Sequence, residues 1–118
     1  MKNLSIILLT LSFFISSSVF AGDTIDQVAK IAKRKTAEFV QVLNLSKDEE
    51  EKVYQILLYK QHHYASLKNE YKADKKAFRA AAKPINVSTN RQLKEIIGAG
   101  KMKKMNQFKR AQRSANQQ

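Results

Sequence analysis

A chain with one proline and three glycines among 118 residues has few places at which it can turn. This shortage argues against sandwiches and barrels, which need many turns between short strands. The length fits a single domain. The chain also has no cysteine, which excludes disulfide bridges, thiolate metal sites and a cysteine nucleophile. We therefore expect one all-α domain.

Apolar residues recur at spacings of three, four and seven between residues 23 and 43, which is typical of one face of a helix. Ser46 stands three residues before Glu49 and predicts the start of a second helix, because each side chain of such a capping box binds the other residue's free amide. This helix is expected to continue to Lys83, where Pro84 ends it. At 1.5 Å per residue it would be about 52 Å long, which indicates an open fold that a second copy completes.

The remaining residues predict two further helices. Residues 85–88 are expected to be a connector, and Ser88 or Thr89 caps the third helix that follows. The last helix is expected to begin at Lys101, after a glycine-containing break. Residues 114–118 are polar, and we expect them to be a disordered tail. The expected fold is therefore four helices, one of them long.

Residues 1–21 have the features of a secretory signal in the usual order. Lys2 gives a positive start, residues 4–15 are a mainly apolar run, and small Ala21 suits the last position before cleavage. The run is shorter than the roughly 20 residues that span a bilayer. The sequence thus predicts export and a mature chain of 97 residues. The alternative is an uncleaved membrane anchor.

The whole chain has 22 Lys and Arg against 10 Asp and Glu. Most of the excess positive charge lies in the C-terminal part. Residues 22–59 have a net charge of −1, whereas residues 60–95 and 101–118 have +6 each. Such a field attracts anionic partners. It also suits nucleic acids, but an exported protein meets little of them, so we expect no nucleic-acid partner.

The segment 43–53 resembles the LTxxQ signature of the Spy/CpxP-like periplasmic proteins. Its Leu45 matches the signature, Ser46 stands in place of threonine, and Glu49 stands in place of glutamine. Both replacements suit a capping box. In this family the signature caps a long helix, so the three residues are expected to be structural.

A second copy of the signature is expected near the C-terminus of such proteins. Residues 93–97 match the apolar run that precedes it, but Gly98 and Lys101 replace the expected threonine and glutamine. The second copy is thus degenerate. The resemblance covers about residues 36–110.

The resemblance implies a cradle-like helical hairpin over residues 22–113 that forms an antiparallel homodimer in the periplasm. It implies an ATP-independent chaperone for unfolded or stress-damaged envelope proteins. Two alternatives stay open: an envelope-stress sensor that binds a dedicated partner protein, and a protein that binds an anionic membrane surface. No cofactor is expected.

A client would contact apolar side chains off the main helical stripes and the basic C-terminal helix. Cations attract the client over distance, and methionine adapts to varied partners. Each group also has a structural alternative. The off-stripe residues could be dimer contacts, the methionines and the phenylalanine beside them could be core residues, and the lysines could form a solvated face. The expected client-binding residues are Ile31, Val42, Tyr54, Leu58, Tyr59, Lys101, Met102, Lys103, Lys104, Met105, Phe108 and Arg110.

The sequence gives little support for catalysis or metal binding. His62 and His63 are adjacent, so a helix directs them about 100° apart and they cannot share one ion without distortion. The acidic cluster at residues 49–51 suits the positive start of a helix. No phosphate-binding loop, zinc-ligand spacing or nucleophile motif is present. The sequence indicates a protein that is not an enzyme and holds no metal.

Overall fold

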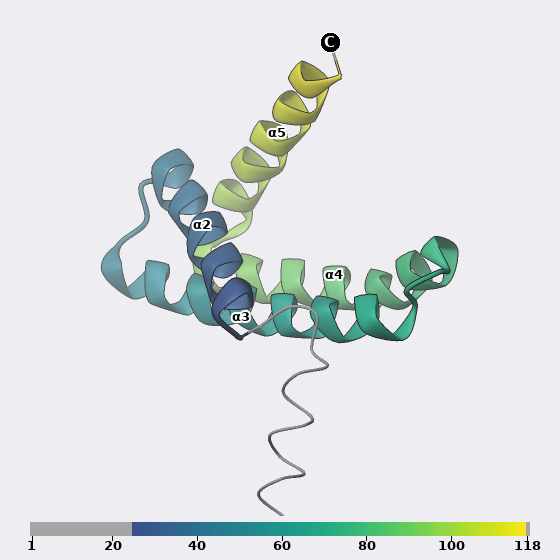
Figure 1. The fold of residues 1–118 in the computed structure, drawn as a ribbon. Helices are drawn as coiled ribbons and strands as arrows, with labels where there is room; N and C mark the ends of the chain where they lie inside the picture. Colours follow the sequence, from purple (N-terminus) through teal and green to yellow (C-terminus); the bar gives the residue numbers. More distant parts are fainter. Residues whose placement is uncertain (1–24, 118) are drawn as a thin grey trace, which may run out of the picture.

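The computed structural model describes residues 25–117, which form four α-helices joined by short connections (Figure 1). The helices are α2 (Ile25–Leu43), α3 (Lys47–Glu70), α4 (Lys75–Ile97) and α5 (Ala99–Asn116). No strand occurs in this range, so the all-α prediction is confirmed. The predicted export signal at residues 1–21 lies outside the described residues.

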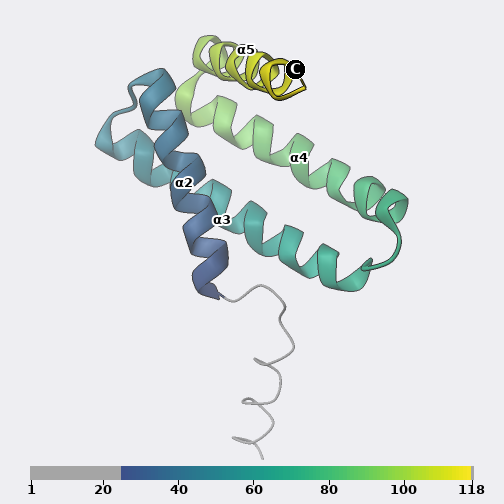
Figure 2. The same ribbon diagram turned by 45° about the horizontal axis from the view of Figure 1, so that its top comes forward.

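The helices α3 and α4 form an antiparallel hairpin, and α2 and α5 pack at one end of it. The helix α2 contacts α3, while α5 contacts both α4 and α2. In Figures 1 and 2, α2 crosses α3, and α5 leaves the end of α4 and runs away from the hairpin. The tip of the hairpin and the C-terminal end of α5 therefore extend beyond the region in which all four helices meet.

The hydrophobic core lies in that region, and every described helix contributes to it. Its largest fully buried side chains include Phe39 of α2, Val53 of α3 and Leu93 of α4. Burial of one such side chain contributes about 1.5–3 kcal/mol relative to exposure. The core consists of Ala32, Phe39, Leu43, Leu45, Val53, Leu57, Leu93, Ile97, Met102 and Met105.

The corner between α2 and α3 confirms the predicted helix start. Asn44 has a φ of 55°, a left-handed conformation that asparagine tolerates and that often follows a helix. The Glu49 N–H donates to Ser46 Oγ at 3.2 Å, and the Ser46 N–H donates to Glu49 Oε1 at 3.1 Å. The capping box is thus complete, and Leu45 beside it is buried in the core.

The prediction of one helix from Ser46 to Lys83 is wrong, because the chain turns at residues 71–74. Asp74 caps the next helix, and its side chain accepts a hydrogen bond from the Ala77 N–H at 3.0 Å. The helix α4 then continues through Pro84, whose side chain is exposed. Proline inside a helix costs about 3 kcal/mol. Burial of Leu93 and Ile97, which the turn brings back against the rest of the core, outweighs this cost.

Four other expectations fail, because α4 and α5 are both longer than predicted. Residues 85–88 are helical rather than a connector, and Thr89 is a buried residue of α4 rather than a cap. The helix α5 begins at Ala99 instead of Lys101 and continues to Asn116, so residues 114–116 are not a disordered tail. Alanine, arginine and glutamine near the end of α5 favour helix and explain this extension.

The corner between α4 and α5 depends on Gly98. Its φ of 92° and ψ of 159° lie in a region that is essentially restricted to glycine. Its N–H donates to the Lys94 carbonyl at 2.8 Å, and its own carbonyl accepts from the Met102 N–H at 3.1 Å. A single residue thus ends one helix and starts the next, which gives a structural reason for glycine where the resemblance predicts threonine.

We expect the turn at the tip of the hairpin to depend on the cap at Asp74. Replacing Asp74 by Ala should destabilise the protein by about 1 kcal/mol, because the free amides at the start of α4 lose their acceptor. Thermal unfolding followed by circular dichroism measures this loss as a lower Tm. Asp74→Asn is the matched control and should stay close to the parent, because asparagine caps helices as well as aspartate. An equal loss in both variants would contradict the capping role.

Candidate interaction surface

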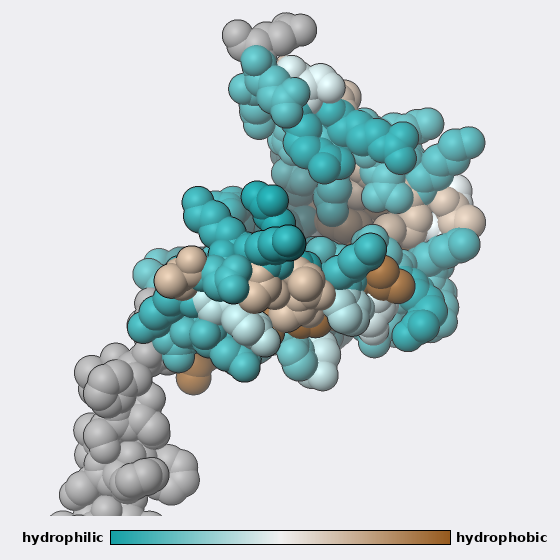
Figure 3. Space-filling view, turned by 90° about the vertical axis from the view of Figure 1, so that its right-hand side faces the viewer, coloured by the Kyte–Doolittle hydropathy of each residue, from teal (hydrophilic) through white to brown (hydrophobic). Residues whose placement is uncertain are grey.

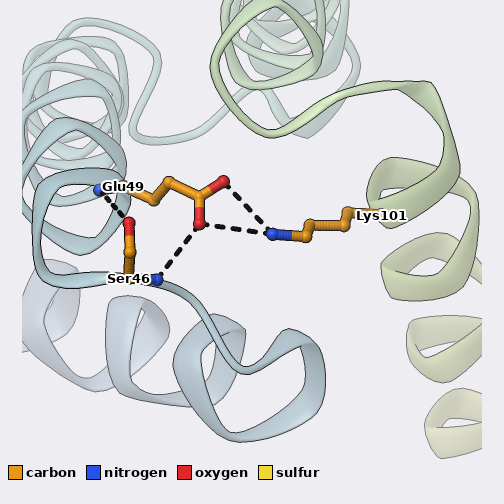
Figure 4. A network of polar contacts seen from close by, with 3 residues as sticks. All are labelled: Ser46, Glu49 and Lys101. Carbon is orange, nitrogen blue, oxygen red and sulfur yellow. Dashed lines mark hydrogen bonds and ion pairs between the residues drawn. The ribbon is translucent and has the colours of Figure 1, made fainter.

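A polar network joins the start of α3 to the start of α5 (Figure 4). The carboxylate of Glu49, already part of the capping box with Ser46, also faces Lys101. The Lys101 Nζ lies 3.2 Å from each of the two Glu49 carboxylate oxygens. The residues that carry the predicted family signature therefore contact the degenerate second copy of that signature.

This network fixes the charge state of Glu49 and occupies Lys101. The Ser46 backbone N–H, followed by the Lys101 ammonium, lowers the pKa of Glu49 below its usual value of 4.5. Glu49 is thus ionised at neutral pH, and Lys101 pairs with it. Lys101 is one of the expected client-binding residues, but its charge lies in a contact within the chain.

The methionines of α5 are core residues. Met102 is 6% exposed and Met105 is 0% exposed. A client could reach them only if the core opened, so the expectation that Met102 and Met105 contact a client is corrected. Both belong to the core cluster to which all four helices contribute.

The other apolar residues of the expected client site differ in exposure. Tyr59 is 63% exposed, and its ring lies 4.4 Å from that of His63. Ile31 is half-buried. Four more are half-buried and pack against the core, which places part of each side chain at the surface: Val42, Tyr54, Leu58 and Phe108.

The strongest feature of the surface is the charge of α4 and α5. These two helices contain 12 Lys and Arg and a single acidic residue, Glu95. Three of the expected client-binding residues, Lys103, Lys104 and Arg110, are exposed on α5. Figure 3 shows a mainly hydrophilic face with small, separate apolar patches, hollowed between α5 at the top and the helices below.

Three helices together form a basic cavity that the sequence patterns do not predict. Its volume is about 430 Å³, and Lys35 of α2, Lys60 of α3 and Lys109 of α5 all line it. Arg34 and Arg113 line it as well, against one carboxylate, Glu38. The buried side chains of Phe39 and Leu57 form its apolar part.

The three lysines of this cavity are half-buried and form no ion pair within 4 Å among residues 25–117. Lys109 Nζ lies 5.0 Å from the ring centre of Phe39, and Lys60 Nζ lies 5.3 Å from that of Tyr64, both cation–π distances. These ring contacts only partly replace the water that the amines lose.

Burial is the main cause that lowers the pKa of all three lysines. The largest change is at Lys60, where burial and the repulsion of Lys35 and Lys109 lower the pKa from 10.5 to about 8. A sequence signal for this cavity exists: Lys60 stands on the apolar stripe of α3, three residues after Leu57. Its partners on α2 and α5 have no comparable signal.

The described helices contain neither a cluster of metal ligands nor a membrane-spanning segment. Within residues 25–117, no group of three or more His, Cys, Asp or Glu side chains could hold a metal ion. His62 and His63 are both exposed. None of the four described helices is both long and apolar enough to cross a membrane.

We expect the Glu49–Lys101 contact to stabilise the junction of α3 and α5 in a pH-dependent way. Glu49→Gln keeps an oxygen that accepts the Ser46 N–H but removes the charge that attracts Lys101. The variant should have a lower Tm than the parent at pH 7. Because folding lowers the pKa of Glu49 below 4.5, the contribution of its charge is present above that pH and is lost as the pH falls.

The difference in Tm between parent and variant should thus shrink as the pH is lowered from 7 to about 3. Glu51→Gln is the matched control, since Glu51 is exposed on the same helix and lies outside this network. It should leave the Tm nearly unchanged. A difference for Glu49→Gln that stays constant over this pH range would rule out the ion pair as its cause.

In comparisons with known proteins, no family model, no curated protein and no solved structure matches the chain. The resemblance to the Spy/CpxP-like family thus rests on the residues quoted above and stays a prediction. The capping box at Ser46 and Glu49 forms as the spacing of these two residues predicts.

Proposed function

We propose that this chain is an ATP-independent, chaperone-like protein of the periplasm that binds unfolded or stress-damaged envelope proteins. The charge of α4 and α5, 12 cations against one anion, is the observation that carries the proposal. A field of this kind speeds the encounter with an anionic or mixed-charge chain by long-range attraction. Because water and salt screen exposed charges, the attraction steers a client without holding it tightly.

Separate apolar patches among the cations supply the second half of the proposed contact. Val87 is 59% exposed and lines a surface hollow of about 410 Å³ on α4 with Ala80 and Pro84. Lys83 and Arg91 line the same hollow. Small apolar contacts of this size hold an unfolded segment weakly. A client that folds buries its own apolar residues and leaves, so release needs no nucleotide.

Suppression of aggregation tests the proposal directly. The mature chain, without ATP, should reduce light scattering by a denatured or reduced client, and capture should slow as salt is raised, because screening shortens the range of the charges. A triple charge reversal on α5, at Lys103, Lys104 and Arg110, should slow capture several-fold at low salt and leave helicity nearly unchanged. Lys101 is left intact because it pairs with Glu49.

The matched control reverses three exposed lysines of α2 and α3, Lys30, Lys33 and Lys68, and so changes the net charge by the same amount. It should slow capture less than the α5 variant. Equal slowing would mean that net charge alone matters and that α5 is not a client surface. Wild-type protein that fails to suppress aggregation in molar excess would refute the proposed function, and binding to vesicles of anionic lipid in its place would favour the membrane-surface alternative.

A homodimer is part of the proposal. All residues from Arg110 to Gln117 are exposed, although Gln112 and Arg113 line the basic cavity. A second copy would complete the cradle by covering the part of this C-terminal half of α5 that leaves Arg110 and Arg113 accessible. We expect sedimentation equilibrium at tens of micromolar to give the mass of a dimer. A monomer at that concentration would contradict the cradle geometry.

A further inference from the structure

We propose that the cavity between α2, α3 and α5 is a binding site for a small anion that carries two phosphate groups. This inference goes beyond client binding, because the cavity lies between three helices and not on one exposed helix face. Five cationic side chains and one carboxylate line it, which leaves a net charge of +4. Each of its half-buried lysines comes from a different helix, so folding brings together charges that are far apart in the sequence.

Formation of the cavity desolvates charged amines, and a bound anion would offset that free-energy cost. Desolvation of a charged amine is unfavourable unless an opposite charge replaces the lost water. Lys60 has the ring of Tyr64 on its own helix and faces Lys35 from α2 and Lys109 from α5. The one acidic residue, Glu38, can balance only one of the five cations. The site therefore has unbalanced positive charge before any ligand binds.

Size and lining define the class of ligand. A volume of about 430 Å³ lies within the range of small-molecule sites and exceeds what one orthophosphate needs. Lysine and arginine together suit phosphate oxygens, lysine as a point charge and arginine as a bidentate donor. Phe39 and Leu57 offer an apolar wall to the rest of such a molecule. The shared chemistry is a diphosphate, free or as part of a lipid headgroup.

Titration calorimetry with inorganic pyrophosphate tests the site in the intact protein. Pyrophosphate should bind with a stoichiometry of one per chain and more tightly than orthophosphate. Lys60→Met should weaken binding at least tenfold. Lys103→Met removes an equal charge from an exposed position of α5 outside the cavity and should change the affinity less than twofold.

The melting temperature separates a binding role of Lys60 from a structural one. Without ligand, Lys60→Met should raise the Tm, because it removes a desolvated cation that two lysines repel. The difference in Tm between variant and parent should be largest below about pH 8 and should shrink as the pH approaches 10.5. Over that interval the folded parent has already lost the proton of Lys60 while the unfolded parent still holds it, so the parent gains stability as the pH rises. With pyrophosphate, the parent should gain Tm and the variant should not.

Vesicles distinguish the sources of the phosphate groups. If vesicles that contain a diphosphate lipid bind with the same dependence on Lys60 and free pyrophosphate does not, the ligand is a lipid headgroup. If pyrophosphate alone binds in this way, the ligand is a soluble diphosphate. If neither ligand binds, or if Lys60→Met weakens binding no more than Lys103→Met does, the cavity is not an anion site. None of these results depends on aggregation suppression, so the site and the proposed chaperone function can fail separately.

Discussion

Burial of one apolar core at one end of an α-helical hairpin determines the rest of this molecule. Phe39, Leu93 and Met105 meet there from three helices, and the first turns of α5 reach the core only because Gly98 adopts a backbone conformation closed to other residues. The pairing of Lys101 with the capped start of α3 adds a polar contact at the same junction. Beyond the core, many residues of the hairpin tip and all residues of α5 from Arg110 on are consequently exposed.

The distribution of charge follows from this geometry. The helices α2 and α3 have nearly balanced charges, whereas α4 and α5 are almost purely cationic. On an exposed helix, like charges cost little, because water screens them. The same charges are more costly where helices converge, as the lowered pKa of Lys60 indicates. An open surface for weak capture and a partly enclosed cavity for a compact anion therefore both follow from the same basic composition.

Local signals predicted the local structure well. The capping box at Ser46 and Glu49 and the stripe of α2 involve residues a few positions apart, and both form as expected. The hairpin turn was missed because Pro84 is a strong local stop signal, whereas the reason to turn earlier is the burial of Leu93 and Ile97 against distant helices. The cavity was missed for a related reason, since Lys35, Lys60 and Lys109 are neighbours only after folding.

The far half of the hairpin has a consequence for motion within the chain. It is joined by the ring contact of Tyr64 with Phe78 and the hydrogen bond of Tyr64 with Asn86, and the Nε2 of buried Gln61 has no hydrogen-bond partner in the described residues. Fewer apolar contacts and an unsatisfied donor make local opening less costly there than in the core. Amide protons around residues 68–80 should therefore exchange with solvent deuterium faster than those of the helix segments near Phe39, so the two ends of one helix pair differ in their protection.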